Sequence, residues 1–142
     1  MVWAFTYASR LHRVNILQKR AVRLVVGAPY GSHTARIFIN LKILKLDQIR
    51  TFQIGEFMYR FDRSLLPPIF NNYFQLSSHV HSHFTRYSFS YRRTYARTNT
   101  RLFSIKSAGI STWEKIPREI RLSPSIWVFK KKLSTFLIEG TQ

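Results

Sequence analysis

The distribution of charge constrains this chain more than any other feature of its sequence. The 142 residues contain 23 Lys and Arg but only 6 Asp and Glu, which gives a formal net charge of +17. Residues 1–46 carry eight of the basic residues and no acid, and residues 63–113 carry seven and again no acid. Because like charges repel one another in a compact state and bound anions relieve that repulsion, the sequence predicts a polyanionic partner. The simpler alternative is a basic surface that only keeps the protein in solution.

The composition is that of a folded domain rather than a basic tail. Hydrophobic residues make up 45% of the chain and aromatic residues 15%, which is enough apolar material for a core. A chain of this length fits one domain that buries about two-thirds of the surface of its unfolded form. The sequence has no cysteine, which excludes disulfides, zinc–thiolate sites, iron–sulfur clusters and cysteine nucleophiles.

The sequence shows no signal for insertion into a membrane or for export. No apolar run reaches the ~18 residues of a spanning helix, and no charged stretch followed by an apolar core opens the chain. We therefore expect no membrane span and no signal peptide. The expected location is inside the cell, in the nucleus or the cytoplasm, and the protein is not expected to be secreted.

Apolar periodicity predicts helices in the first half of the chain. In residues 11–26, six apolar residues recur at three- and four-residue steps and form one stripe, which we expect to face the core: Leu11, Val14, Leu17, Ala21, Leu24 and Val25. Gly27 and Pro29 then stop this helix, since glycine accepts the left-handed conformation after a helix and proline prevents its continuation. Asp47 is a suitable N-cap for a helix over residues 48–61, whose apolar residues cover more than one face and predict a buried position.

The second half of the chain begins with a break and a polar segment. Leu65-Leu66-Pro67-Pro68 ends the helical half, because the residue before a proline avoids the helical conformation. Residues 77–100 are rich in Ser, Thr, His, Arg, Asn and Tyr, and predict a long basic loop that is ordered alone or orders on binding. A short strand is predicted next, formed by Leu102, Phe103 and Ile105 and ended by Gly109.

Together these elements predict a mainly α fold, a compact helical domain with a short β element and a long basic loop in its second half. We expect a single domain over residues 1–142. Its parts are a helical half (1–64), a middle part with the proline break, the basic loop and the short strand (65–111), and C-terminal helices (112–138).

Three histidines in the polar segment are candidate metal ligands. His79, His81 and His83 alternate along the chain, so on a strand they would share one face about 7 Å apart, a spacing that can chelate a metal ion. No thiol or nearby carboxylate supports them, and the surrounding cations repel a divalent ion. We therefore predict a polar loop without a metal.

The sequence patterns of an enzyme are absent. The chain has no Gly-x-Ser-x-Gly elbow, no Gly-rich phosphate loop and no His-Glu-x-x-His. Its six acids are scattered, with Asp47 and Asp62 a full helix apart, whereas two-metal phosphoryl transfer needs clustered carboxylates. We predict a protein that is not an enzyme, has no cofactor and takes no small-molecule substrate.

Arginines alternate with aromatic residues over residues 86–101, and this pattern favours nucleic acid as the partner. Arginine side chains pair with phosphates, and exposed rings stack on unpaired bases. The alternative is that the rings anchor the loop to the core and the arginines are only solvated. The predicted binding residues are Arg13, Lys19, Arg20 and Arg23 on the first helix, with Arg86, Tyr91, Arg92, Arg93, Tyr95, Arg97 and Arg101 in the second half.

A series of short motifs also occurs in a fixed order from residue 3 to residue 137. It includes Trp3 and Tyr7, Leu17-Gln18-Lys19-Arg20-Ala21-Val22-Arg23, Tyr30-Gly31-Ser32-His33-Thr34, Leu65-Leu66-Pro67-Pro68, His81-Ser82-His83-Phe84-Thr85-Arg86, Trp113-Glu114-Lys115-Ile116-Pro117 and Phe129-Lys130. In this order the motifs resemble the region that follows the polymerase core in reverse transcriptases of non-LTR (LINE-type, jockey-like) retrotransposons. Each motif alone is unspecific, and the resemblance depends on their shared order.

The resemblance implies a noncatalytic, C-terminal fragment of an RNA-directed DNA polymerase. The adjacent aspartate pair on which that family's polymerase depends is missing, because the sequence contains no Asp-Asp. The implied role is to hold template RNA or target DNA beside an active site, with a polymerase core acting in trans as a further partner. Two other interpretations stay open: a degenerate relic reading frame without a selected activity, and a basic protein-interaction module that docks on an acidic partner.

Overall fold

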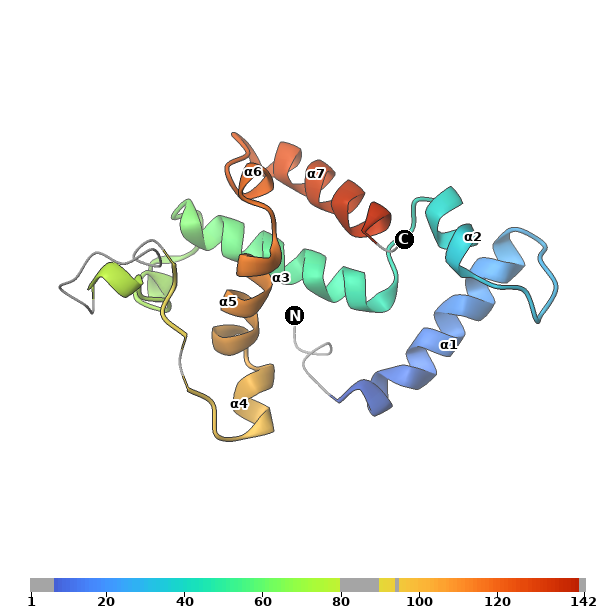
Figure 1. The fold of residues 1–142 in the computed structure, drawn as a ribbon, viewed down its shortest axis with the longest axis horizontal. Coiled ribbons are helices and arrows are strands. Elements are labelled where there is room, and N and C mark those ends of the chain that lie inside the picture. Colours follow the sequence, from blue (N-terminus) through green and yellow to red (C-terminus); the bar gives the residue numbers. More distant parts are fainter. Residues whose placement is uncertain (1–6, 80–89, 94, 141–142) are drawn as a thin grey trace. The chain divides into compact units, whose positions relative to one another are not determined.

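The structure is a computed structural model that describes residues 7–79, 90–93 and 95–140. Its helices are α1 (Ala8–Val25), α2 (Ala35–Asn40), α3 (Leu46–Asp62), α4 (Asn99–Phe103), α5 (Ile105–Lys115), α6 (Arg118–Arg121) and α7 (Ile126–Glu139), with short 3-10 helices η1 (Pro68–Phe70) and η2 (Ser77–His79) (Figure 1). The prediction of a mainly helical fold is confirmed. None of the helices described is both long and apolar enough to span a bilayer.

The chain divides into two compact units. Unit 1 comprises Met1–Gln53 and Lys130–Gln142, and unit 2 comprises Ile54–Phe129. The boundaries fall inside α3 and inside α7, and they do not coincide with the boundaries expected near residues 65 and 112. The single domain over residues 1–142 stays a prediction.

Unit 1 is built on α1, which begins and ends close to the predicted residues. Gly27 follows the helix with a φ of +64°, a conformation that glycine adopts without strain, so the predicted stop signal is confirmed. The side chain of Gln18 ties α1 to the start of α3: its Nε2 donates to the carbonyl oxygen of Leu44 at 2.9 Å, and its Oε1 accepts from the backbone N–H of Leu46 at 3.0 Å. The buried side chains of this unit include Val22, Phe38 and Leu46.

The expected orientation of α1 is wrong, because most of its apolar stripe faces solvent. Val22 is buried, and Gln18 is half-buried on the same side of the helix, whereas Leu17 and Leu24 are exposed. The reason is that α1 packs on the six-residue α2 and on the turn before α3, which cover only one side of the helix. On that side Gln18 is favoured over an aliphatic residue, because its amide satisfies two backbone groups that have no helical partner.

Unit 2 has a core of aromatic and aliphatic side chains from α3, α5 and α7. The ring of Tyr59 stacks on Phe129 with 4.5 Å between the ring centres, and its hydroxyl donates to the carbonyl oxygen of Ser123 at 2.8 Å. Met58 and Ile110 are also completely or almost completely buried. The prediction that the helix after Asp47 is largely buried holds for this part of α3, where Ile54, Met58 and Tyr59 are buried. The predicted N-cap is wrong, because α3 begins at Leu46 and Asp47 lies inside its first turn.

The predicted short strand is wrong. Leu102 and Phe103 belong to α4, Ile105 begins α5, and Gly109 lies inside α5. The side chain of Thr98 accepts a hydrogen bond from the backbone N–H of Arg101 at 3.4 Å, which makes it the N-cap that starts α4. A short apolar run does not by itself distinguish a strand from a buried helix. Here the N-cap at Thr98 favours the helix. The described residues form no sheet.

Candidate nucleic-acid interface

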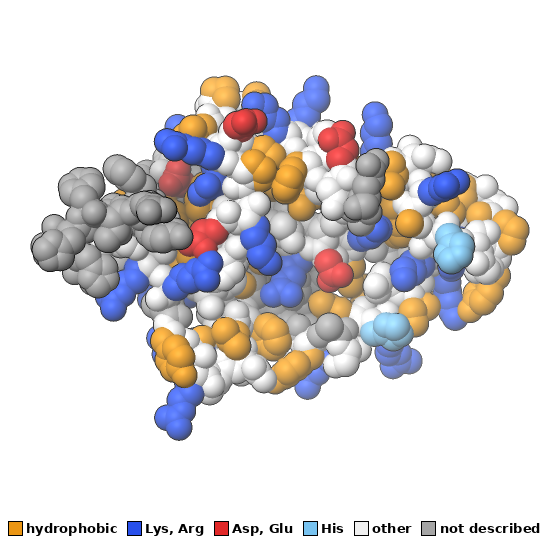
Figure 2. All heavy atoms as spheres, viewed as in Figure 1, with side chains coloured by type: hydrophobic (Ala, Val, Ile, Leu, Met, Phe, Trp, Pro, Cys, Tyr) orange, Lys and Arg blue, Asp and Glu red, His pale blue; other side chains and the backbone are white. Residues whose placement is uncertain are grey.

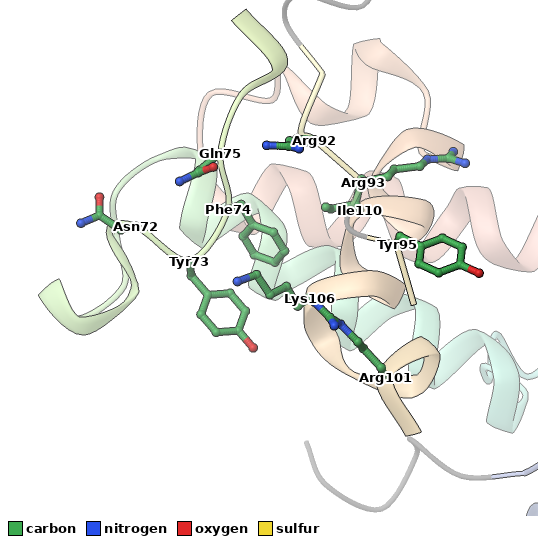
Figure 3. A pocket seen from close by; sticks show the side chains of 10 residues that line it. All are labelled: Asn72, Tyr73, Phe74, Gln75, Arg92, Arg93, Tyr95, Arg101, Lys106 and Ile110. Atoms are coloured by element: carbon green, nitrogen blue, oxygen red, sulfur yellow. The ribbon is translucent and has the colours of Figure 1, made fainter. Parts of the chain in front are cut away.

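A short antiparallel pairing fixes part of the predicted basic loop. Leu76 and Tyr91 form an isolated β-bridge, the N–H of Arg92 donates to the carbonyl of Gln75 at 2.8 Å, and the N–H of Ser77 donates to the carbonyl of Ser90 at 2.9 Å. Because successive side chains of an extended segment point to opposite sides, the side chain of Arg92 points away from the side on which those of Tyr91 and Arg93 lie. Figure 3 shows Arg92 and Arg93 pointing in different directions.

Tyr91 anchors this segment to unit 2. Its ring packs against Phe61 and Phe74, with 5.7 and 5.8 Å between the ring centres, and its hydroxyl donates to Oδ1 of Asp62 at 2.8 Å. The pKa of the Tyr91 hydroxyl is raised, mainly because the hydroxyl is buried. Its hydrogen bond to Asp62 and the negative charge of that residue raise the pKa further. The alternative considered above, a ring that anchors the loop, therefore describes Tyr91. Its ring is committed to protein contacts and is not free to stack on a base.

An open hollow of about 440 Å³ lies beside the anchored segment. Lys and Arg side chains are spread over the face drawn in Figure 2 instead of gathering in one patch, so charge alone does not locate a site. The hollow identifies a candidate site, because four basic side chains and no acidic side chain line it. Its lining residues are Asn72, Tyr73, Phe74, Gln75, Arg92, Arg93, Tyr95, Arg101, Lys106 and Ile110 (Figure 3).

Two of the four cations come from consecutive helices. Arg101 lies in the last turn of α4 and Lys106 in the first turn of α5, and both side chains are exposed. The Nζ of Lys106 lies 5.5 Å from the centre of the Tyr73 ring, within the range of a cation–π contact. This contact orients the ammonium group at the wall of the hollow. Tyr95 supplies a second ring, which is 84% exposed.

Arg93 differs from the other three cations because an acid already neutralises it. Its Nε donates to Oε2 of Glu114 at 3.1 Å, and its Nη2 contacts the same carboxylate oxygen. The hydrogen bond and the charge of Glu114 raise the pKa of Arg93. For an incoming anion, Arg92, Arg101 and Lys106 are therefore the main cations of this hollow.

The predicted residues of the first helix belong to unit 1 and make a separate group. Arg20 and Arg23 place their guanidinium groups 5.8 and 5.9 Å from the centre of the Tyr30 ring. The Nη2 of Arg20 also donates to the Tyr30 hydroxyl at 3.3 Å, and the Nε of Arg23 donates to the carbonyl of Ser32 at 2.9 Å. Arg13 and Lys19 are exposed on the same helix.

The remaining predicted residues are not part of the hollow. Arg97 is exposed but does not line it, and Arg86 lies outside the described residues. Of the three histidines, His81 and His83 are outside the described residues as well, and His79 ends η2. Within the described part of the chain, no group of His, Cys, Asp or Glu side chains is arranged to hold a metal ion.

Asn72, Tyr73 and Lys106 line the hollow and were missed at the level of sequence. Lys106 had a usable signal: identifying Thr98 as an N-cap places Arg101 and Lys106 on successive helical turns, whereas the expected strand separated them. Tyr73 had no comparable signal, because its place on the wall depends on tertiary packing of the segment after the proline pair.

No family model, no curated protein and no solved structure matches this chain.

Proposed function

We propose that this protein binds single-stranded nucleic acid in the hollow of unit 2 and catalyses no reaction. The observation that carries the proposal is the lining itself, which combines three cations available to an anion with two tyrosine rings and has no carboxylate. In keeping with the order of its motifs, we also propose that the chain is a C-terminal fragment of a non-LTR retrotransposon reverse transcriptase. In this role it grips RNA or DNA, and a polymerase core in trans is a further partner.

The two kinds of side chain match the two parts of a nucleotide. Arg92, Arg101 and Lys106 supply positive charge for the phosphates, and the arginines also supply paired donors. The exposed ring of Tyr95 offers a stacking surface for a base, which an unpaired strand presents and a duplex hides. We therefore expect single strands to bind more tightly than duplexes of the same length.

The test removes charge from the hollow and compares it with an equal loss of charge elsewhere in unit 2. The hollow variant is Arg101→Gln/Lys106→Gln, and the control is Lys115→Gln/Arg118→Gln, an exposed Lys and Arg that do not line the hollow. Filter-binding titrations with single-stranded and duplex RNA and DNA are made at two salt concentrations. The hollow variant should reduce the slope of log affinity against log salt by up to about 1.4 for single strands, from roughly 0.7 for each lost phosphate contact.

The control variant should keep a larger share of the affinity, since its charges act only through the general field of the protein. Equal losses in the two variants would show that the hollow is not the binding site. A third variant, Tyr95→Ala, should weaken single-strand binding more than duplex binding, because stacking contributes about 1–3 kcal/mol per base. An equal effect on both would show that the ring does not stack.

A further inference from the structure

A row of apolar side chains on α1 is left without a partner after the helix has packed within unit 1. We call Val14, Leu17, Ala21 and Leu24 the α1 stripe. Leu17 is 60% exposed, Leu24 81% and Val14 45%. Their steps of three, four and three residues put them on one face of the helix, with the spacing of a seam that packs against a second helix.

The other side of α1 already serves the fold. Val22 is buried there, and Gln18 bonds to the backbone of Leu44 and Leu46. Apolar residues exposed singly are normal, but a continuous row on a regular helix marks an interaction surface. The α1 stripe is therefore available for a partner without disturbing the contacts that hold α1 in place.

Positive charge runs along one edge of the α1 stripe. Arg13 and Arg20 are seven residues apart and lie next to Leu17, and together with Ile16 they line a shallow hollow of about 280 Å³. No acid occurs anywhere in residues 1–46 to neutralise these side chains. In helix pairs, charges beside the apolar seam determine which partner is accepted.

These features select one kind of occupant. A second copy of this chain would bring Arg13 and Arg20 against the same cations, with no acid in this helix to pair with them. A nucleic acid would satisfy the arginines but would not bury Leu17 or Leu24. A membrane-surface helix carries an apolar face with large aromatic residues, whereas α1 contains no Trp, Phe or Tyr and Arg10 continues the line of the stripe toward the N-terminus.

We propose that the α1 stripe docks an acidic amphipathic helix of another protein, which covers the stripe with apolar residues and pairs Arg13 and Arg20 with carboxylates. This inference goes beyond the proposed binding of nucleic acid and does not depend on it. Helix-in-groove recognition of this kind uses apolar anchors at three- and four-residue spacing, which the stripe provides.

The probe is a synthetic helical peptide with Leu at the a and d positions and Glu at the e and g positions of each heptad. Its glutamates repel one another in a peptide dimer, so it requires a basic partner. Binding to the full chain is followed by fluorescence anisotropy at physiological ionic strength. The same peptide with Lys in place of Glu is the charge control.

The decisive variant is Leu17→Gln/Leu24→Gln, and its matched control is Ile69→Gln/Leu122→Gln, two apolar residues of unit 2 that are also exposed. The variant should lose affinity for the Glu peptide by at least about tenfold, because two leucine side chains no longer become buried. The control should bind as the parent does. Circular dichroism should show unchanged folding in both, since all four side chains face solvent in the parent. A second variant, Arg13→Gln/Arg20→Gln, should weaken binding of the Glu peptide and flatten its salt dependence.

Several results would overturn the proposal. Unchanged affinity in Leu17→Gln/Leu24→Gln would show that the peptide is held by unspecific charge. Equal binding of the Lys peptide would show that Arg13 and Arg20 do not select an acidic partner. Self-association of the parent that this variant abolishes would identify a second copy as the occupant. Binding of the parent to phosphatidylserine vesicles that the variant abolishes would identify a membrane. A loss of RNA affinity in this variant would assign the stripe to nucleic acid. Whether the hollow of unit 2 binds RNA is tested independently by Arg101→Gln/Lys106→Gln.

Discussion

Gly109 is a position in unit 2 where an added methyl group tests the packing of α5 against α3. A Cβ at this position would lie 3.0 Å from Sδ of Met58 and 3.3 Å from Cζ of Phe74. Non-bonded heavy atoms prefer separations of about 3.5–4.0 Å, so both contacts are too short. Met58 is completely buried and Phe74 is 6% exposed, and neither can move into solvent without opening the core.

Two opposing terms determine the outcome of Gly109→Ala. Alanine is favoured over glycine inside a helix by about 1 kcal/mol, which stabilises the variant. Adding a methylene-sized group to a well-packed core typically costs about 1–3 kcal/mol, and the flexible thioether of Met58 places this site toward the middle of that range. We therefore expect Gly109→Ala to lower the free energy of unfolding by roughly 1 kcal/mol.

Urea unfolding followed by far-ultraviolet circular dichroism measures this change. Gly31→Ala is the control, because a Cβ at Gly31 would meet no atom within 4 Å, and it should be neutral or slightly stabilising. In a Met58→Ala background the short contact to sulfur is gone and the lost side chain leaves room for Phe74 to shift, so the same Gly109→Ala change should become neutral or stabilising. A stabilising Gly109→Ala in the parent, or an identical effect in both backgrounds, would refute the packing argument.

Three further predictions concern a titration, a buried hydrogen bond and catalysis. The pKa of the Tyr91 hydroxyl is raised in the folded protein, so its neutral form contributes stability that is lost as the pH rises above about 10. Above that pH, the free energy of unfolding should therefore fall less steeply with pH in Tyr91→Phe than in the parent. Equal slopes in the parent and in Tyr91→Phe would contradict this role of Tyr91. Tyr59→Phe should lower the free energy of unfolding by about 1 kcal/mol, since the buried carbonyl of Ser123 loses a donor, and an unchanged urea midpoint would rule this out. With primer, template, magnesium and nucleotides, the purified protein should not extend the primer, and extension beyond that of a mock purification would disprove the noncatalytic assignment.

The extent of α1 was predictable because it depends on local chemistry. The period of the apolar residues defines α1, and Gly27 with its φ of +64° ends it, both of which are visible in the sequence. The packed side of α1 was not predictable in the same way. Gln18, and not Leu17, lies on the packed side, because its amide bonds to two backbone groups of a turn more than twenty residues away. No local sequence pattern contains that information.

The candidate site was predictable in its chemistry and less so in its members. The arginines and tyrosines of residues 91–101 stand out in the sequence, and three of the arginines line the hollow. The different roles of Tyr91 and Tyr95 depend on which ring reaches Asp62 and Phe74, a tertiary contact that their similar sequence surroundings do not reveal. Lys106 was not predicted, because the sequence favours a strand over residues 102–105, where the structure has the end of α4 and the start of α5. An error in local structure thus became an error in the site.

The excess of charge is shared by both units, and this bears on how the two proposed surfaces differ. Unit 1 holds 12 Lys and Arg against 2 acids, and unit 2 holds 11 against 4, so general attraction of anions does not favour one surface strongly over the other. The hollow of unit 2 offers charge and rings, and its binding should weaken steeply with salt because it depends on the release of counterions. The α1 stripe instead exposes leucine surface that a docked partner would bury, and burial of apolar surface is not screened by salt. Binding that survives high salt and disappears on polar substitution of Leu17 and Leu24 therefore belongs to the stripe, whereas binding that salt abolishes and Arg101→Gln/Lys106→Gln weakens belongs to the hollow.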